Sequence, residues 1–298
     1  MKRLRRSMLF VPANHPGMIF QAPVFRPDCI IFDLEDAIPV REKDSARDLL
    51  VEAVKTLDFG DCEVFARINP LYTPFGEEDV RALTAAGLKN YRLPMTESPE
   101  DIRTLDRLLT KLEQEHSLKQ DSLKILGAIE TAKGVLNAPA IALSSQRLLG
   151  ISFGAEDFTR SMTTERSKTG EEMFWARSHI VLAAMAAGID AIDTVFADLD
   201  DEEAFTAEVK MAKQLGFSGK SLIHPSQINV VHALFSPGTE EIRQARRIID
   251  AMEEAEQKGA GVIVVDGKMV DEPVLVRARR VMELAIGSGL IKGGGSDV

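Results

Sequence analysis

Three carboxylates follow directly on an apolar run in the stretch IIFDLEDAI, residues 30–38; they are Asp33, Glu35 and Asp36. The run has the composition of a buried strand. Ionised carboxylates are costly to bury unless they are paired, hydrogen-bonded or close to a metal ion. Negative charge at the end of a core strand therefore needs a cation or a hydrogen-bond donor nearby, and the ends of the other apolar runs are where it could come from.

Further polar side chains stand where other apolar runs end. They are Arg67 in ARIN, Glu130 in GAIET, Glu156 and Asp157 in SFGAEDF, and His224 in LIHP. One arginine among several carboxylates at a single rim would form a divalent-cation site beside an anion clamp. Oxygen ligands favour Mg²⁺, which takes one or two carboxylates and completes its shell with water and substrate oxygens.

Each of these residues also has a structural interpretation. A strand-end carboxylate often caps the next helix or pairs with a neighbouring arginine, and Arg67 is as well suited to a structural ion pair as to an anion clamp. For His224, which precedes Pro225, we favour a hydrogen bond to the backbone of its own turn. The clustering of several charges favours a site, and it predicts a metal-dependent enzyme acting on an anionic substrate. The clustering of charges alone does not identify the reaction.

Short apolar runs alternate with longer amphipathic stretches, which is typical of βα units around a parallel sheet. The expected strands cover residues 7–11, 29–32, 63–68, 90–93, 124–129, 148–153, 191–196 and 220–223. Between them lie helical patterns, for example at residues 41–57 and at residues 98–116, where Ser98 is the expected N-cap and Pro99 the first helical residue. Eight such units predict an α/β fold, a (β/α)₈ TIM barrel. A doubly wound open sheet is the rival, but no glycine-rich dinucleotide turn follows any strand.

The barrel architecture explains why the charges would meet. Barrel enzymes carry their sites on the loops after the C-terminal ends of the strands. All the polar residues named above lie at such ends, so we expect them at one mouth.

The pattern changes after residue 225. A helix is followed by GVIVVDGKMVDEP, in which Asp266-Gly267 between apolar runs predicts a β-hairpin. A closing helix at residues 274–286 runs into a tail that we expect to be disordered. We therefore divide the chain into a catalytic barrel domain, 1–225, and a C-terminal helical and β-hairpin extension, 226–298, with a subunit-contacting hairpin.

The composition excludes several classes of protein. The 298 residues hold 46 Asp and Glu against 36 Lys and Arg, a net charge of −10, which argues against nucleic acid or an anionic membrane surface as partner. No stretch approaches the ~20 apolar residues that span a bilayer, and the N-terminal apolar stretch is too short for a signal peptide. Cys29 and Cys62 lack metal-ligand spacing and are expected to be free thiols. These features indicate a soluble, cytoplasmic protein.

Seven motifs in order resemble the HpcH/HpaI aldolase superfamily, and within it the citrate lyase β subunits, which are citryl-thioester lyases. They are RSMLFVPANHPGM, IIFDLEDAI, ARINP, GAIETAKGVLNA, GAEDFTR, GFSGKSLIHPSQI and GKMVDEP. Each motif alone is weak, but they occur in order, and the resemblance runs from about residue 6 to residue 280. The resemblance implies an enzyme that cleaves a citryl thioester, carried on an acyl carrier protein or CoA, into oxaloacetate and an acetyl thioester.

The resemblance also implies roles for individual residues. Glu130 and Asp157 would bind Mg²⁺ directly, with Glu130 also facing the substrate. Arg67 would hold a carboxylate of the oxaloacetate half, for which its planar fork is suited. Glu35 and Asp36 would hydrogen-bond metal-bound water and keep the site negative enough to retain the cation.

Two further residues complete the expected site. In related lyases an aspartate of a hairpin like GKMVD reaches the active site of an adjacent subunit, and this residue is Asp271 here. It would take part in proton transfer during cleavage; the alternative is that it caps the final helix. We expect Asp33 to be structural and to pair with a rim arginine.

The chain departs from the family pattern at two positions. Ala13 stands where glycine is common, and Met95 stands where a rim lysine is common. The second change removes a positive charge and puts the details of substrate binding in question.

The resemblance implies partners as well: citrate lyase α and γ subunits and a homotrimer or homohexamer. The alternatives are a free-standing citramalyl-CoA or malyl-CoA lyase, a class II aldolase acting on 2-keto-3-deoxy acids, and a non-catalytic scaffold subunit. The presence of Glu130 and Asp157 argues against a scaffold.

Overall fold

The structure is a computed structural model that describes residues 3–257, 263–265 and 267–292. It divides into two compact units, which are described separately. One is Arg5–Val231, and the other combines Met1–Leu4 with His232–Val298. The catalytic and subunit-contacting roles that we assign to residues 1–225 and 226–298 stay predictions.

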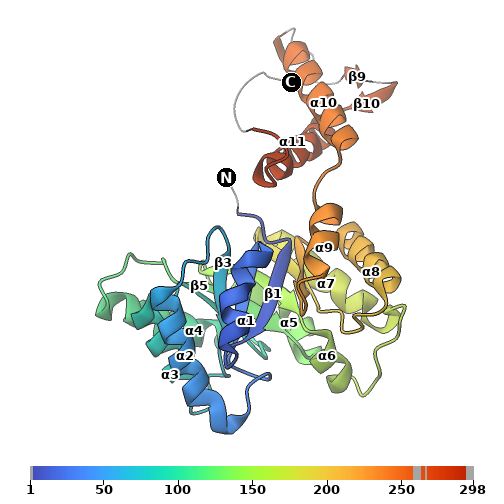
Figure 1. Ribbon diagram of the computed structural model, residues 1–298. Helices are drawn as coiled ribbons and strands as arrows, with labels where there is room; N and C mark the ends of the chain where they lie inside the picture. Colours follow the sequence, from blue (N-terminus) through green and yellow to red (C-terminus); the bar gives the residue numbers. More distant parts are fainter. Residues whose placement is uncertain (1–2, 258–262, 266, 293–298) are drawn as a thin grey trace. The chain divides into compact units, whose positions relative to one another are not determined.

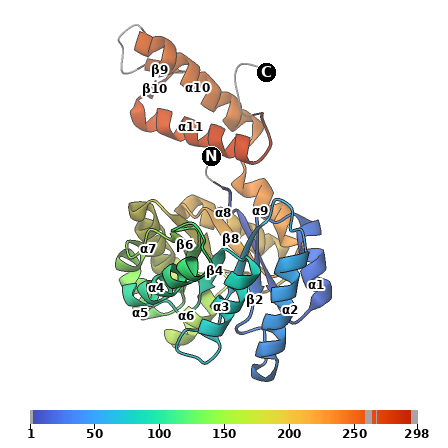
Figure 2. The same ribbon diagram turned by 90° about the vertical axis from the view of Figure 1, so that its left-hand side faces the viewer.

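The larger unit is a closed barrel of eight parallel strands in sequential order, which confirms the predicted (β/α)₈ fold (Figures 1 and 2). The strands are β1 (Ser7–Pro12), β2 (Cys29–Asp33), β3 (Glu63–Arg67), β4 (Asn90–Leu93), β5 (Lys124–Ile129), β6 (Leu148–Phe153), β7 (Asp190–Asp193) and β8 (Gly219–Leu222).

Helices surround these strands in both views (Figures 1 and 2). They are α1 (Pro16–Gln21), η1 (Ala22–Phe25), η2 (Val40–Glu42), α2 (Lys43–Thr56), α3 (Gly76–Ala86), α4 (Pro99–Glu115), α5 (Ala132–Ala142), α6 (Ala155–Ser161), α7 (Glu171–Ala187) and α8 (Glu202–Leu215), and α9 (Gln227–Phe235) follows β8. As predicted, Ser98 is the N-cap of α4, and its backbone N–H donates to Asp101 Oδ2 at 2.8 Å.

Period-two alternation decides which side chains enter the barrel, because successive residues of a strand face opposite sides. Residues of one parity form a buried cluster inside it: Met8, Cys29, Ile31, Phe65, Leu126 and Ile192. Continuing that parity towards the C-terminal ends reaches Asp33 on β2 and Arg67 on β3. The same rule that buries the apolar cluster therefore points these charged side chains into the mouth.

Two strands are shorter than predicted, and β3 lacks only the last residue of its expected range. The seventh, expected to run to residue 196, ends at Asp193. Beyond it the chain leaves the ladder, and the Thr194 hydroxyl accepts a hydrogen bond from the backbone N–H of Ala155 at 2.9 Å. The residues that follow, Thr194 and Val195, line the cavity described below and do not belong to the strand.

The smaller unit contains α10 (Thr239–Gln257), an antiparallel hairpin of β9 (Ile263–Val265) and β10 (Lys268–Val270), and α11 (Glu272–Gly287). The predicted hairpin is thus confirmed, although Asp266 of its turn lies outside the described residues, as does much of the expected tail. Its buried core is Ala245, Ile248, Val270 and Ala278.

Two composition-based expectations can be compared with the structure. Cys29 and Cys62 are free thiols, as predicted. In the described part of the chain, no helix combines the length and apolar character that crossing a bilayer requires.

Candidate active site

A cavity of about 430 Å³ opens at the C-terminal ends of the strands, a volume in the range of small-molecule sites. Its charged lining consists of Asp33, Asp36, Arg67, Arg92, Glu130, Glu156 and Asp157. Five carboxylates against two guanidinium groups leave an excess of negative charge. An acidic excess in a partly closed cavity is stabilised by a bound cation.

Asp33 and Arg67 form the structural base of this mouth. Arg67 donates from Nε and Nη2 to the two Asp33 oxygens at 2.7 and 2.6 Å, a bidentate pair. Asp33 also accepts the backbone N–H groups of Glu35 and Ala37. Burial alone would raise the pKa of Asp33, but the hydrogen bond and charge of Arg67 outweigh it and lower the pKa. The expectation that Asp33 pairs with a rim arginine is confirmed.

The third nitrogen of Arg67 faces the two other carboxylates of the same loop. Nη1 lies 2.9 Å from Glu35 Oε2 and 3.1 Å from Asp36 Oδ2. The Glu35 oxygen is buried and, despite this distance, makes no hydrogen bond of good geometry. Burial raises the pKa of Glu35 to about 8; the charge of Arg67 opposes this rise and the neighbouring carboxylates add to it. Lys43 holds the loop by donating to the carbonyls of Leu34 and Glu35.

Glu130 follows β5 and lies 3% exposed at the floor of the cavity. Its Oε1 accepts from Arg92 Nη2 at 3.1 Å, and its Oε2 accepts from the backbone N–H of Met95 at 2.8 Å. Gly154 leaves room for the side chain, because a Cβ there would lie 2.5 Å from Glu130 Cγ. The carboxylate is therefore held in one orientation with oxygen lone pairs left for a further ligand.

Asp157 lies in the first turn of α6 and faces the same cavity. Burial raises its pKa, and the nearby charge of Glu130 adds to the rise. Arg160 pairs with it at 2.7 Å, although the arginine side chain is 76% exposed. Two carboxylates that repel each other across a cavity favour a cation between them.

These residues fit the hypothesis of a magnesium site. In the described part of the chain, no group of three or more His, Cys, Asp or Glu side chains converges on a metal position. A closed protein cage is thus not formed by the described residues. Two carboxylates beside an open cavity match Mg²⁺, which keeps several water or substrate oxygens.

The structure brings together the five predicted site residues of the barrel: Glu35, Asp36, Arg67, Glu130 and Asp157. Their roles toward metal and substrate stay predictions.

Asp271 belongs to the smaller unit and caps α11, where its side chain accepts from the N–H of Val274. The alternative role, capping of the final helix, is thus confirmed, and the action of Asp271 on another subunit stays a prediction. His224 behaves as favoured: its Nδ1 accepts the backbone N–H of Ser226 within the turn.

The two departures from the family pattern have structural settings. Ala13 is fully buried and has no positive φ, so a methyl group is tolerated there. Met95 has φ +49°, which directs its N–H to Glu130, while its side chain lines a separate cavity of about 270 Å³. Met95 therefore contributes to the site through its backbone N–H, which holds Glu130.

Arg92 is a residue that our sequence analysis missed. It stands inside β4, one residue before the strand ends, and pairs in register with Arg67 on β3. The sequence did contain a signal for Arg92, because side chains alternate between the two faces of a strand. This alternation places Arg67 and Arg92 on the inner face of the barrel.

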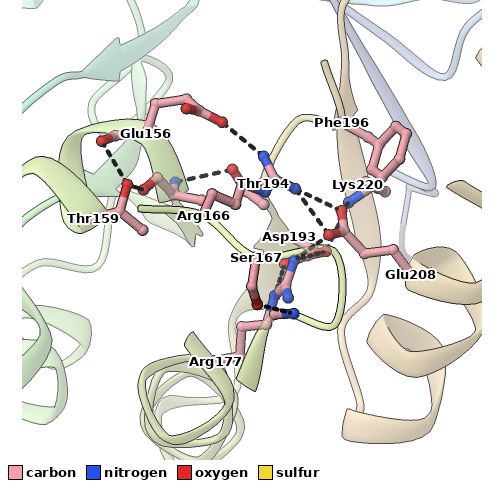
Figure 3. A network of polar contacts seen from close by, with 12 residues as sticks. Glu156, Thr159, Arg166, Ser167, Arg177, Asp193, Thr194, Phe196, Glu208 and Lys220 are labelled. Atoms are coloured by element: carbon pink, nitrogen blue, oxygen red, sulfur yellow. Dashed lines mark hydrogen bonds and ion pairs between the residues drawn. The ribbon is translucent and has the colours of Figure 1, made fainter. Parts of the chain in front are cut away.

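A second charged network joins the strands β7 and β8 to the helices α7 and α8 that cover them (Figure 3). We call it the wall network; its members are Glu156, Arg166, Arg177, Asp193, Glu208 and Lys220. Glu208 accepts from Lys220 at 2.6 Å and from Arg166 at 2.8 Å. Burial alone would raise the pKa of Glu208, but the surrounding cations lower it to about 2. Arg166 thereby ties the loop before α7 to Glu156 at the rim.

The fold and the mouth define a class: a (β/α)₈-barrel protein with a carboxylate-rich, arginine-flanked site of the kind used by metal-dependent enzymes on anionic substrates. Residues 6–225 match the model of the HpcH/HpaI aldolase/citrate lyase family. The chain therefore belongs to this family, which confirms the resemblance seen in the sequence.

Individual relatives extend the match to nearly the whole chain. Citrate lyase subunit beta of Leuconostoc mesenteroides subsp. cremoris is 48% identical over 295 residues, covering 99% of this chain and 98% of the relative. The mitochondrial citramalyl-CoA lyase of Homo sapiens is 33% identical, covering 94% of this chain and 85% of the relative. The crystal structure of CitE from Mycobacterium tuberculosis with magnesium, acetoacetate and coenzyme A has a TM-score of 0.78 and 30% identity, covering 96% of this chain and 99% of that one.

Proposed function

We propose that this protein is a Mg²⁺-dependent carbon–carbon lyase that cleaves a citryl thioester into oxaloacetate and an acetyl thioester. The observation that carries the proposal is the pair Glu130 and Asp157 beside Arg67 at one barrel mouth. The 48% identity to a citrate lyase subunit beta supports the choice of substrate.

The reaction sets the requirements of the site. The bond between the hydroxyl-bearing carbon and the methylene next to the thioester breaks. The hydroxyl loses its proton to a base and becomes the ketone of oxaloacetate, while the bonding electrons form a thioester enolate. Protonation of that enolate on carbon gives the acetyl thioester.

Glu130 and Asp157 are the residues that would hold the metal ion. Mg²⁺ bound there supplies a Lewis acid for the hydroxyl or carbonyl oxygen of the substrate. The fixed orientation of Glu130, set by Arg92 and the N–H of Met95, costs no reorganisation when the ion binds. Glu35 and Asp36 add negative charge close by, which retains the cation.

Arg67 supplies the fixed positive charge for a substrate carboxylate. Its guanidinium contacts three carboxylates of the loop after β2. A substrate carboxylate would take over the Nη1 donors from Glu35 and Asp36, while the bidentate pair with Asp33 keeps the guanidinium in place. Asp271 of a neighbouring subunit is the proposed group for proton transfer.

We further propose that the chain works in a citrate lyase complex with α and γ subunits, in the cytoplasm, and as a homotrimer or homohexamer. The word subunit in the name of the 48% identical relative supports a complex. The oligomeric state of the purified chain is measured by sedimentation velocity.

A free-standing citramalyl-CoA lyase is the second candidate, because a relative of that name covers 94% of this chain at 33% identity. It would use the same metal site. The two candidates differ in the group attached to the reacting carbon, which is a carboxymethyl group in citryl and a methyl group in citramalyl thioesters.

The deciding experiment measures oxaloacetate released from citryl-CoA by the purified protein, with Mg²⁺ and with EDTA, beside Asp157→Ala. Metal-dependent release that the variant abolishes would support the proposal. Citramalyl-CoA and malyl-CoA, assayed through pyruvate and glyoxylate, rank the acyl groups. No release from any of the three substrates would contradict the proposal for the isolated chain.

A further inference from the structure

Arg92 is the one residue of the cavity lining whose buried guanidinium donors lack acceptors in the described part of the chain. The residue is 3% exposed, and its Nε and Nη1 are buried without a hydrogen-bond partner. Only Nη2 is used, for Glu130 Oε1 at 3.1 Å. Since Nε carries one hydrogen and Nη1 two, three of its five N–H groups are unpaired.

The contrast with Arg67 makes this unusual. Both guanidinium groups lie over the Phe10 ring, with Cζ 5.2 Å from its centroid in each case. Arg67, however, contacts three carboxylates, whereas Arg92 contacts one. Two neighbouring arginines on one aromatic platform thus differ in how much positive charge they leave for a ligand.

Buried donors without acceptors are costly, and native proteins leave few of them. An arginine in a ligand cavity with free donors is therefore prepared for an anion, and a planar carboxylate suits it best. The apolar floor below it, formed by Phe10, strengthens such a contact by excluding water.

We infer that Arg92 is a second carboxylate subsite, which binds the distal carboxylate of the substrate and selects a dicarboxylate acyl group over a monocarboxylate one. The inference rests on the proposed function, in which the citryl group brings two free carboxylates. Arg67 holds the one on the reacting carbon, and Arg92 holds the carboxymethyl arm. Citramalyl and malyl thioesters carry only the first, so they leave the donors of Arg92 unpaired.

A site built to bind a polar group discriminates strongly against analogues that lack it. Replacing Arg92 with methionine should therefore act on substrates unequally. We expect Arg92→Met to lower kcat/KM for citryl-CoA by about 10³-fold and that for citramalyl-CoA by about tenfold, so that the ratio falls roughly 100-fold. Arg92→Lys, which keeps the charge without the planar fork, should fall between the two.

The smaller loss of kcat/KM, which we expect for every thioester, has a separate origin. Arg92 also orients Glu130, so its removal weakens the metal site for every substrate. Arg160→Met is the matched control, because Arg160 pairs with the other predicted metal ligand, Asp157, at 2.7 Å. It should change kcat/KM for all three thioesters by one common factor.

Product binding provides a readout that does not depend on turnover. Calorimetric titration with Mg²⁺ present should show that Arg92→Met weakens oxaloacetate binding about 100-fold and leaves pyruvate binding within about threefold. Circular dichroism melting identifies any variant that fails to fold, in which case Arg92→Lys decides the question.

The outcomes separate the two claims. Equal losses with all three thioesters and with both products would overturn the subsite, while wild-type cleavage of citryl-CoA would leave the proposed function standing. Wild-type protein that cleaves none of the thioesters would contradict the proposed function. The oxaloacetate and pyruvate titrations would still test Arg92 in that case.

Discussion

The mouth of the barrel and the wall network contain the same kinds of charged residue, but the pKa of a buried carboxylate is lowered in the wall and raised at the mouth. In the wall network, three cations face three carboxylates, and Glu208 has its pKa lowered to about 2 by Lys220 and the arginines in spite of its burial. At the mouth, burial raises the pKa of Glu35 to about 8, and it also raises the pKa of Asp157.

The difference lies in the balance of charge, since the wall network matches three carboxylates with three cations whereas the lining of the mouth has five carboxylates and two arginines. Buried charges that are paired stabilise a unique arrangement. Although Arg177 Nη1 makes no hydrogen bond among the described residues, the wall network fixes α7, α8 and the loop containing Arg166 against the strands (Figure 3). The mouth instead holds excess carboxylate, a buried Glu35 oxygen without a hydrogen bond and free arginine donors. Groups missing their partners in the chain are what a binding site needs, because ligands supply the partners.

The largest effect should come from removing one charge at the mouth. Glu130→Gln keeps the shape of the side chain but removes a predicted metal ligand, and it also removes the one carboxylate that buried Arg92 contacts, so some stability is lost as well. We expect kcat/KM for citryl-CoA to fall by at least ~10³-fold, with the Mg²⁺ concentration for half-maximal rate strongly increased. The assay is oxaloacetate release across a Mg²⁺ titration, with urea unfolding in EDTA to show that the variant is folded under the assay conditions. Activity within tenfold of wild type would mean that Glu130 does not hold the metal.

The same chemical change in the wall should have the opposite profile. Glu208→Gln leaves Lys220 and two arginines short of a counter-charge, which should lower the free energy of unfolding by about 3 kcal/mol. The activity of the folded protein should stay within about threefold. Urea unfolding measures the first and rates below the transition measure the second.

Glu203→Gln is the control, since it makes the same exchange at an exposed position of the same helix. Its unfolding free energy should stay within about 0.5 kcal/mol of wild type. If Glu208→Gln changed the unfolding free energy as little as Glu203→Gln does, the wall network would not stabilise the fold.

A smaller effect should follow from crowding Glu130. Gly154→Ala adds a Cβ 2.5 Å from Glu130 Cγ, so the carboxylate must turn away from its place. We expect kcat/KM to fall by roughly 10- to 100-fold, since misplacing a catalytic group by about 1 Å has effects of that size. Gly17→Ala is the control, because nothing lies within 4 Å of its Cβ position; it should behave as wild type. An unchanged rate in Gly154→Ala would show that the orientation of Glu130 is not critical.

The fold was largely predictable because its signals are local. Apolar runs such as residues 124–129 became β5 without a shift in bounds, and Ser98 with Pro99 placed the start of α4. Charges that follow a strand directly, such as Glu130, were recognised for the same reason.

What escaped prediction depends on three-dimensional pairing. Arg92 stands within a four-residue strand, NYRL, where only the register with β3 and the alternation of the barrel reveal that it faces the cavity. The wall network joins residues from five elements and a loop, so no local pattern indicates that Asp193 and Lys220 find their partners on α7 and α8. The pKa shifts are likewise set by charges that are far apart in the sequence.

The smallest effect should appear in the pH dependence of stability in the metal-free protein. The folded-state pKa of Glu35, about 8, lies above its unfolded value near 4.5. The folded state then binds more protons than the unfolded state between these values, so stability falls as the pH rises through this window. Glu208 gives the opposite sign, because its pKa of about 2 makes stability fall only when the pH drops below about 4.5. In EDTA, we expect a loss of about 1 kcal/mol between pH 7 and pH 8, measured by urea unfolding. Glu35→Gln should remove this slope, and saturating Mg²⁺ should reduce it because a cation favours the ionised carboxylate. If wild type and Glu35→Gln gave the same slope in EDTA, the mouth would not hold the carboxylate of raised pKa that distinguishes it from the wall.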